Sequence, residues 1–88
     1  MALLDLLGRR MTLRILWELR AGRLTFRALQ DAAGTNPSVL NTRLAELRAA
    51  HLVDHDGDGY GLTAHGDDLM HRLAHLNAWA QAWAKRTD

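Results

Sequence analysis

The chain contains no cysteine, no long hydrophobic run and almost no lysine. The absence of cysteine excludes disulfides and thiolate metal sites as a means of stabilising a domain of only 88 residues. A domain of this size buries a limited fraction of its surface, so pairing with a second copy is the remaining way to enlarge its core. We therefore expect one domain over residues 1–88 that forms a homodimer.

No hydrophobic run in the chain reaches the ~20 residues that a membrane-spanning helix requires. The apolar start is interrupted by Asp5 and is followed by positive charge, which is unlike a secretory signal. Hydrophobic residues nevertheless make up 48% of the chain, which is too high for a disordered protein. These properties predict a globular cytoplasmic protein with no membrane partner.

Arginine carries nearly all of the positive charge, and it is concentrated in the first half of the chain. Residues 1–50 contain eight arginines against four acidic residues, whereas residues 51–88 contain three basic residues against six aspartates. Arginine forms bidentate contacts with phosphate and guanine, so the first half suits nucleic acid. Arginine-rich codon usage with solvated helix faces is an equal alternative at this point.

Capping residues divide the chain into short helices, and each is placed to accept a hydrogen bond from the helix that it begins: Thr12, Thr25, Asn36 and Thr63. The pair Asn36-Pro37 is a strong helix start, because proline at the first helical position has no N–H that needs a partner. Leucines at positions 40, 44 and 47 then predict a helix with one buried face.

Residues 52–55 and 60–62 are predicted to be short strands, because the sequence "DGDG" between them is typical of a hairpin turn. Two helices joined by a glycine-containing turn and followed by a hairpin have the order of a winged helix-turn-helix. We therefore predict a mostly α fold with a small β-hairpin. Its recognition helix is expected over 37–49, its wing over 52–62, and a long C-terminal dimerisation helix over about 64–85.

Four stretches of the chain resemble the pattern of one known family. "GRRMTLRILWELRAGRLTFRAL" is similar to G-G-K-W-T followed by an apolar helix and F-S-E-L, and "TNPSVLNTRLAELRAAHLV" to I-S-P-K-V-L-T-Q-R-L-R-E-L-E-x-A-G-L-V. "YGLTAHG" is similar to Y-x-L-T-x-x-G, and "LAHLNAWAQAWA" to a final helix rich in Leu and Ala-Trp. In order and spacing, the chain resembles the HxlR family of bacterial winged-helix transcription regulators, which is distantly related to MarR proteins.

The resemblance implies a homodimer that binds DNA, but the chain departs from the pattern at several places. Met11 replaces the family's tryptophan, and Ser38 replaces the lysine of the recognition helix. The wing shrinks to "HDGDGYG" and holds no Lys or Arg, so phosphate repulsion argues against the minor-groove contact that the resemblance implies. Several family members sense electrophiles through a cysteine near the N-terminus, and without cysteine this mechanism is absent.

Short polar side chains occupy the exposed face of the predicted recognition helix. A purely solvated face would favour better helix formers, so Ser38, Asn41 and Thr42 indicate contacts with bases. For Arg43, a phosphate contact and a bridge to another helix are equal alternatives. Together with arginines that flank helix starts, the predicted DNA-binding set is Asn36, Ser38, Asn41, Thr42, Arg43, Arg27 and Arg10.

The predicted last helix carries a heptad stripe of apolar residues that ends in tryptophan. Part of the stripe must pack on the domain's own core, but one small core does not cover all of it. The short apolar segment at the start of the chain adds to this surface. The predicted dimer interface is Leu3, Leu4, Leu7, Leu69, Leu73, Leu76, Trp79, Ala80 and Trp83.

Two further sets of residues suit a ligand but also have an ordinary structural explanation. Asp67, His71 and His75 have a spacing that suits a metal, although a solvated helix face explains them as well. Four aromatic residues suit a pocket for a small apolar effector, although core packing is the commoner role of such side chains: Trp17, Tyr60, Trp79 and Trp83. We predict no bound metal and no cofactor.

Enzyme chemistry finds no support in the sequence, which has no cysteine nucleophile, no Gly-rich phosphate loop and no Ser-His-Asp set in a strand-turn-helix context. We predict a sequence-specific transcriptional regulator, acting as a repressor, that binds double-stranded operator DNA as a homodimer. The alternative is a winged-helix module for protein interaction that has lost DNA binding, which the acidic wing and Ser38 favour.

Overall fold

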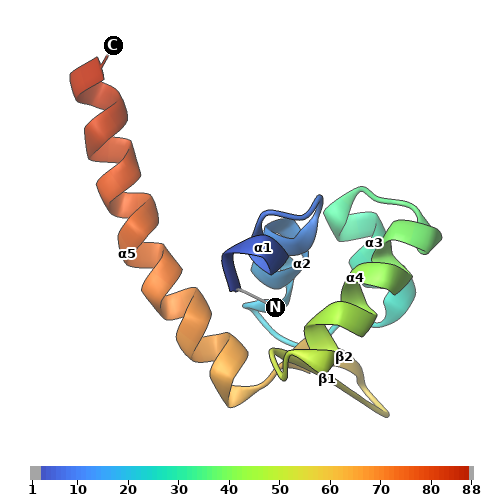
Figure 1. Ribbon diagram of the computed structural model, residues 1–88. Helices are drawn as coiled ribbons and strands as arrows, with labels where there is room; N and C mark the ends of the chain where they lie inside the picture. The colour runs from blue at the N-terminus through green and yellow to red at the C-terminus, as the bar shows by residue number, and fades with distance from the viewer. Residues whose placement is uncertain (1–2, 88) are drawn as a thin grey trace.

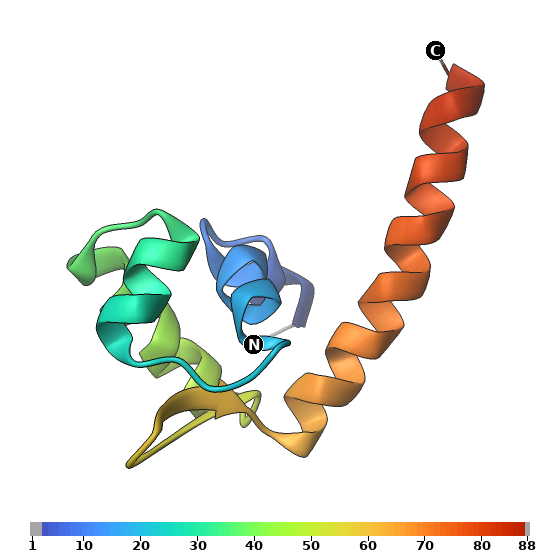
Figure 2. The ribbon, with the colours of Figure 1, turned by 180° about the vertical axis from the view of Figure 1, so that it is seen from behind.

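The computed structural model describes residues 3–87, which form five helices and one two-stranded sheet. In chain order the elements are α1 (Leu3–Leu7), α2 (Thr12–Leu19), α3 (Phe26–Ala33), α4 (Pro37–Ala49), β1 (Val53–Asp56), β2 (Gly59–Leu62) and α5 (Ala64–Thr87). Helices α1 to α4 and the hairpin gather into one body, from which most of α5 projects (Figures 1 and 2). The predicted mostly α fold, a winged helix-turn-helix, is confirmed.

One face of each helix of the body supplies the hydrophobic core. In α4, Leu40, Leu44 and Leu47 are buried at the spacing that the sequence indicates. The other core residues come from α1, α2, α3 and the start of the hairpin: Leu6, Ile15, Leu16, Leu19, Leu29, Ala33, Leu52 and Val53. Burying one leucine side chain contributes about 2 kcal/mol, so this core fixes how each helix is rotated about its own axis.

The two caps that frame the helix-turn-helix are confirmed. Thr25 Oγ1 accepts a hydrogen bond from the N–H of Ala28 at 3.2 Å, and Asn36 Oδ1 accepts one from the N–H of Val39 at 2.9 Å. Between them, Gly34 ends α3 with a φ of 68°, a conformation that favours glycine. The turn between α3 and α4 is therefore fixed by residues within a few positions of one another.

The prediction that Thr12 caps α2 is wrong. Met11 takes the cap position with a φ of 73° and makes no side-chain cap bond, while Thr12 is the first residue of the helix. The Thr12 side chain is buried, and its Oγ1 has no hydrogen-bond partner among residues 3–87. The core takes up the threonine methyl group, and the hydroxyl stays unsatisfied.

The hairpin is confirmed, with each strand reaching one residue further toward the loop than predicted. Asp56 lies opposite Gly59, so Gly57 and Asp58 form a two-residue loop. Gly59 has a φ of 114°, and a Cβ there would lie 2.3 Å from the carbonyl oxygen of Leu24. This close approach arises because the segment before α3 forms a one-residue β-bridge with β2.

Helix α5 is anchored to the body at its first turns. Thr63 Oγ1 accepts a hydrogen bond from the N–H of Gly66 at 3.1 Å and donates one to the carbonyl of His51 at 2.6 Å, so the predicted cap also ties α5 to the turn that follows α4. The 24 residues of α5 span about 36 Å at 1.5 Å per residue. No helix within residues 3–87 is long and apolar enough to cross a membrane.

Replacing Gly66 by alanine is expected to lower the free energy of unfolding by about 1–3 kcal/mol. A Cβ at this position would lie 2.1 Å from the carbonyl oxygen of Leu52, and this clash outweighs the ~1 kcal/mol gain in helix propensity. Gly57→Ala is the matched control, because a Cβ there meets no atom within 4 Å. Urea unfolding followed by circular dichroism compares the two; an unchanged midpoint for Gly66→Ala would contradict the contact.

Replacing Thr12 by valine is expected to raise the free energy of unfolding by about 1 kcal/mol, because valine keeps the shape and removes the unsatisfied hydroxyl. The control Thr12→Ser keeps the hydroxyl and removes a methyl group, which is expected to cost about 1 kcal/mol. Thermal unfolding measures both variants. A destabilised Thr12→Val would mean that the hydroxyl has a partner.

Candidate nucleic-acid interface

The exposed face of α4 carries the short polar residues that the sequence assigns to base contacts. Because the leucines of α4 are turned into the core, Ser38, Asn41 and Thr42 lie exposed on the other side. Thr42 Oγ1 donates a hydrogen bond to the Ser38 carbonyl at 3.0 Å. The Asn41 side chain makes no hydrogen bond within residues 3–87, so its amide can both donate to and accept from a base edge.

Asn36 lies at the N-terminal end of the same helix, and the cap engages its side chain. Since Oδ1 accepts from the Val39 N–H, only Nδ2 is left to donate to DNA while the cap holds. The bidentate contact that asparagine makes with adenine uses both atoms. The cap thus leaves the Nδ2 group of Asn36 as the donor for DNA, and a bidentate contact with adenine would require Oδ1 to be shared with the cap.

Arg43 is directed into the protein rather than away from it. Its Nε donates to the carbonyl of Arg10 at 2.8 Å, and its Nη1 lies 2.5 Å from Glu46 Oε1. Glu46 also forms an ion pair with Arg9. Of the two roles that the sequence left open, this geometry favours the bridge, which joins α4 to the loop between α1 and α2. A phosphate contact through Nε or Nη1 of Arg43 would require this bridge to open.

Arg10 and Arg27 are exposed, and within residues 3–87 neither side chain has an ion pair or hydrogen bond. Arg27 lies in the first turn of α3, the helix that precedes α4, and Arg10 lies just before α2. Side chains in such positions can bind phosphates and so fix the orientation of a protein on DNA without reading its sequence.

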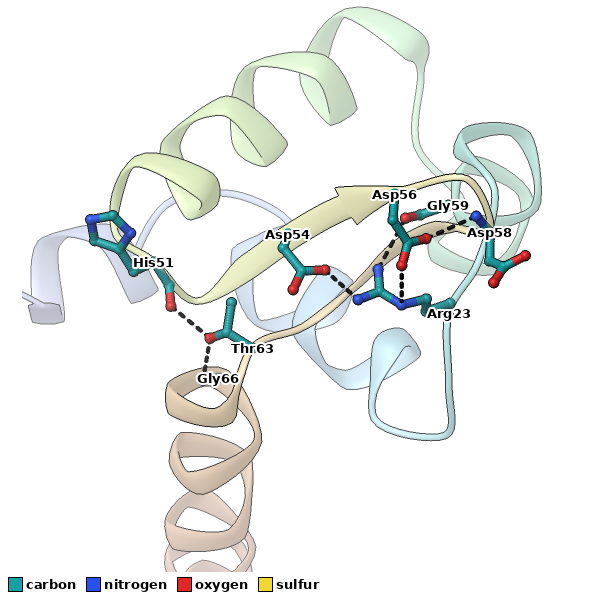
Figure 3. A network of polar contacts seen from close by, with 8 residues as sticks. All are labelled: Arg23, His51, Asp54, Asp56, Asp58, Gly59, Thr63 and Gly66. Atoms are coloured by element: carbon teal, nitrogen blue, oxygen red, sulfur yellow. Dashed lines mark hydrogen bonds and ion pairs between the residues drawn. The ribbon is translucent and has the colours of Figure 1, made fainter.

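The wing carries three aspartates, and Arg23 lies against two of them (Figure 3). Arg23 Nη2 is 2.5 Å from Asp54 Oδ1, and Nε is 3.2 Å from Asp56 Oδ2. Its Nη1 donates to the carbonyl of Gly59 at 3.1 Å. The hydrogen bond with Asp54, helped by the charges of Asp56 and Asp58, raises the pKa of Arg23 above its ordinary value. Arg23 is thus a fixed positive charge on an acidic hairpin.

Arg23 is the residue that sequence reasoning missed. The strand register places Asp54 opposite Gly61 and Asp56 opposite Gly59, so one face of the hairpin has carboxylates on β1 and no side chains on β2. Arg23 fills this space, and a Cβ on Gly61 would lie 2.8 Å from its Cγ. Two glycines opposite two aspartates are the signal that could have indicated a cation here.

The residues predicted for the dimer interface fall into two groups. Some are half-buried, as they also pack on the body or line the groove beside α2: Leu7, Leu69, Leu73 and Ala80. The others are exposed: Leu3, Leu4, Leu76, Trp79 and Trp83. Trp79 and Trp83 stack with ring centroids 6.1 Å apart, and Trp79 is 62% exposed. Much of the apolar stripe therefore has no cover within the described chain.

A groove of about 490 Å³ separates α2 from α5, and most of its lining is apolar. Leu13 and Trp17 form its α2 side and are 45% and 43% exposed. Leu13 is absent from the predicted interface, because its place beside α5 follows from the tertiary fold alone. The groove extends the apolar stripe of α5 onto the body.

The four aromatic residues considered for an effector pocket do not gather at one place. Tyr60 stacks on His55 at 4.3 Å on the wing, whereas Trp17 faces α5 and Trp79 and Trp83 lie further along that helix. The structure therefore separates this set into two surfaces.

The histidines considered for a metal site lie on the exposed face of α5. His71 Nδ1 is 3.5 Å from Asp67 Oδ2. Over residues 3–87, no three His, Cys, Asp or Glu side chains come together in an arrangement that could hold a metal ion.

Comparison with known proteins agrees with this architecture. The sequence model of the HxlR-like helix-turn-helix family matches residues 6–88. An uncharacterized HTH-type transcriptional regulator of Methanocaldococcus jannaschii, MJ0925, is 27% identical to this chain, over 94% of this chain and 83% of that protein.

Two solved structures have the same fold. Quinone-bound YodB from B. subtilis superposes with a TM-score of 0.83 at 28% identity, over 89% of this chain and 90% of that chain. MepR, a transcription regulator of the Staphylococcus aureus multidrug efflux pump MepA, superposes with a TM-score of 0.72 at 18% identity, over 88% and 63% of the two chains. By its sequence and its fold, the chain belongs to the HxlR-like helix-turn-helix family and is a DNA-binding transcriptional regulator, not an enzyme.

Proposed function

We propose that the protein is a sequence-specific repressor that binds operator DNA as a homodimer. The observation that carries this proposal is the outward face of α4, where Ser38, Asn41 and Thr42 are exposed while the leucines of the same helix are buried. Asparagine, serine and threonine form hydrogen bonds with base edges in the major groove. The second helix of a helix-turn-helix is the one that enters this groove.

Phosphate contacts are assigned to the exposed arginines near helix starts. Arg10 and Arg27 suit this role, because the described protein offers their side chains no partner. Arg43 is assigned to the bridge with Glu46, so α4 reads bases chiefly with its neutral polar residues.

The homodimer is supported by the uncovered apolar surface of α1, α5 and the groove beside α2. Exposed apolar patches of this kind mark interaction sites, and the heptad spacing of the stripe favours a helix as the partner element. A second copy supplies such a helix and gives the two-fold symmetry with which helix-turn-helix proteins bind paired half-sites.

We further propose that the protein acts in the cytoplasm and represses transcription. A bound dimer needs only to occupy an operator that overlaps a promoter in order to exclude polymerase. A reporter gene under the promoter upstream of the protein's own gene tests the sign of regulation. Deletion of the protein should raise expression of the reporter, and a fall in expression would identify an activator instead.

The groove between α2 and α5 supports a second candidate role, the binding of a small apolar effector. YodB is described as quinone-bound, and the groove here is large and apolar enough for a ring compound. The chain has no thiol for a covalent adduct, so a ligand would be held through contacts with Leu13, Trp17 and Leu76. We favour the partner helix as the occupant, because the groove is continuous with the stripe on α5.

The roles assigned to Asn41 and Arg27 differ in their effect on selectivity. Asn41→Ala is expected to weaken operator binding by about 1–3 kcal/mol and to leave binding to random DNA nearly unchanged. Arg27→Ala is expected to weaken both and to reduce the salt slope by about 1. Gel shifts at several salt concentrations, with the DNA upstream of the protein's own gene, measure these effects.

Two results of these gel shifts would decide against the proposal. Equal losses on both DNAs for Asn41→Ala would remove it from base recognition. No shift by the wild-type protein at low salt would favour the alternative of an interaction module that has lost DNA binding.

Trp79→Glu is expected to convert a dimer at micromolar concentration into a monomer, because a carboxylate would be buried in an apolar interface. A cost of about 3 kcal/mol weakens the dimer more than a hundredfold. Ala78→Glu adds the same charge on the opposite side of α5 and should leave the dimer intact. Light scattering measures the mass of each; a monomeric wild-type protein would contradict the dimer.

A further inference from the structure

We propose that Arg23 is the internal counter-ion of the wing: it clamps Asp54 and Asp56 and so limits the negative field that the wing presents to DNA. The inference rests on the proposed contact of α4 with DNA. It makes Arg23 a positioning residue rather than a phosphate ligand.

Every nitrogen of the Arg23 guanidinium has an acceptor on the wing. Nη2 and Nε lie on the carboxylates of Asp54 and Asp56, and Nη1 donates to the carbonyl of Gly59 (Figure 3). The Arg23 side chain is 31% exposed, against about half for the two aspartates. A contact with phosphate would have to break these bonds, which are of the strong charge-assisted kind.

The backbone also holds Arg23 on the hairpin. The next residue, Leu24, exchanges two hydrogen bonds with Tyr60: its N–H donates to the Tyr60 carbonyl at 3.0 Å, and its carbonyl accepts from the Tyr60 N–H at 2.8 Å. The Arg23 side chain then lies over Gly61, where any larger residue would collide with it. The clamp is therefore built into the fold and does not depend on a bound partner.

The wing itself is negatively charged and lies close to α4. Residues 52–62 contain three aspartates and no Lys or Arg, and the hairpin follows α4 after three residues, beside the end of that helix (Figure 1). A duplex that lies on α4 carries one phosphate charge per ~1.7 Å of its axis. Without Arg23, the wing would present three unbalanced carboxylates to that field. Arg23 offsets one of these charges and holds Asp54 and Asp56, whereas the Asp58 carboxylate at the loop makes no ion pair within residues 3–87.

A double mutant separates the clamp from a phosphate contact. Arg23→Ala is expected to weaken binding to a 20-bp random-sequence duplex about tenfold at low salt, because it removes the positive charge that offsets the carboxylates of the wing. Adding Asp54→Asn to Arg23→Ala restores the net charge of the wing, and the affinity is expected to return to within twofold of the wild-type value. Fluorescence anisotropy over a range of salt concentrations gives affinity and salt slope for each protein.

Arg27→Ala, alone and with Asp54→Asn, is the control, because a lost phosphate contact is not replaced when a carboxylate of the wing is neutralised. If Arg23→Ala behaves like Arg27→Ala, with an affinity that Asp54→Asn does not restore and a salt slope reduced by about 1, Arg23 is a phosphate ligand and the proposal is wrong. If the wild-type protein does not bind DNA at all, the proposed function fails and this inference fails with it.

A second variant tests the proposal without touching the clamp. The backbone N–H of Asp58 donates to Asp56 Oδ1 at 2.8 Å, and within residues 3–87 the Asp58 carboxylate makes no hydrogen bond or ion pair. Asp58→Asn is expected to raise affinity for the same duplex about threefold at low salt, an effect that salt should abolish. Asp68→Asn is the matched control, since it makes the same charge change on α5, beside Arg72. Equal effects of the two substitutions would show that the field of the wing does not reach DNA, and would overturn the proposal.

Discussion

The burial of Leu40, Leu44 and Leu47 is the constraint on which the rest of the interface depends. These side chains fix the rotation of α4, and the rotation decides which residues face outward. The Asn36 cap determines where α4 begins, and the hydrogen bond from Arg43 to the loop before α2 fixes one side of the helix to the body. The base recognition that we propose therefore requires no movement of α4 within the body.

The fold was predictable wherever neighbouring residues determine it. Thr25 and Asn36 act on groups three positions away, and the Asp-Gly turn closes its own hairpin, so the sequence indicates these features directly. Thr12 was mispredicted because its hydroxyl suits a cap position whereas its methyl group suits the core. Which of the two it occupies is determined by the tertiary fold and not by the neighbouring residues. The family comparison confirms the class of protein, whereas the individual DNA contacts remain predictions.

The site was less predictable, because long side chains reach partners far away in the sequence. Arg23 finds its carboxylates 31 and 33 positions later, and Arg43 bonds to a carbonyl 33 positions earlier. The high count of arginines in the first half thus overstates the charge that is available to DNA. Several of these residues are engaged inside the protein, in ion pairs or on an aromatic ring: Arg9, Arg14, Arg20, Arg23 and Arg43.

Helix α5 is held to the body only near its first turns, around Thr63 and Gly66, so a small change of angle there has a large effect at the other end of the helix. At Gly66 the helix lies against the Leu52 carbonyl, where there is no room for a side chain. The C-terminal part of the helix extends away from the body (Figure 2). A tilt of ~10° at this position would move the far end of the ~36 Å helix by about 6 Å. In the proposed dimer, joined along the C-terminal parts of α5, the angle at Thr63 and Gly66 therefore determines the distance between the two α4 helices and the spacing of the half-sites that they can reach.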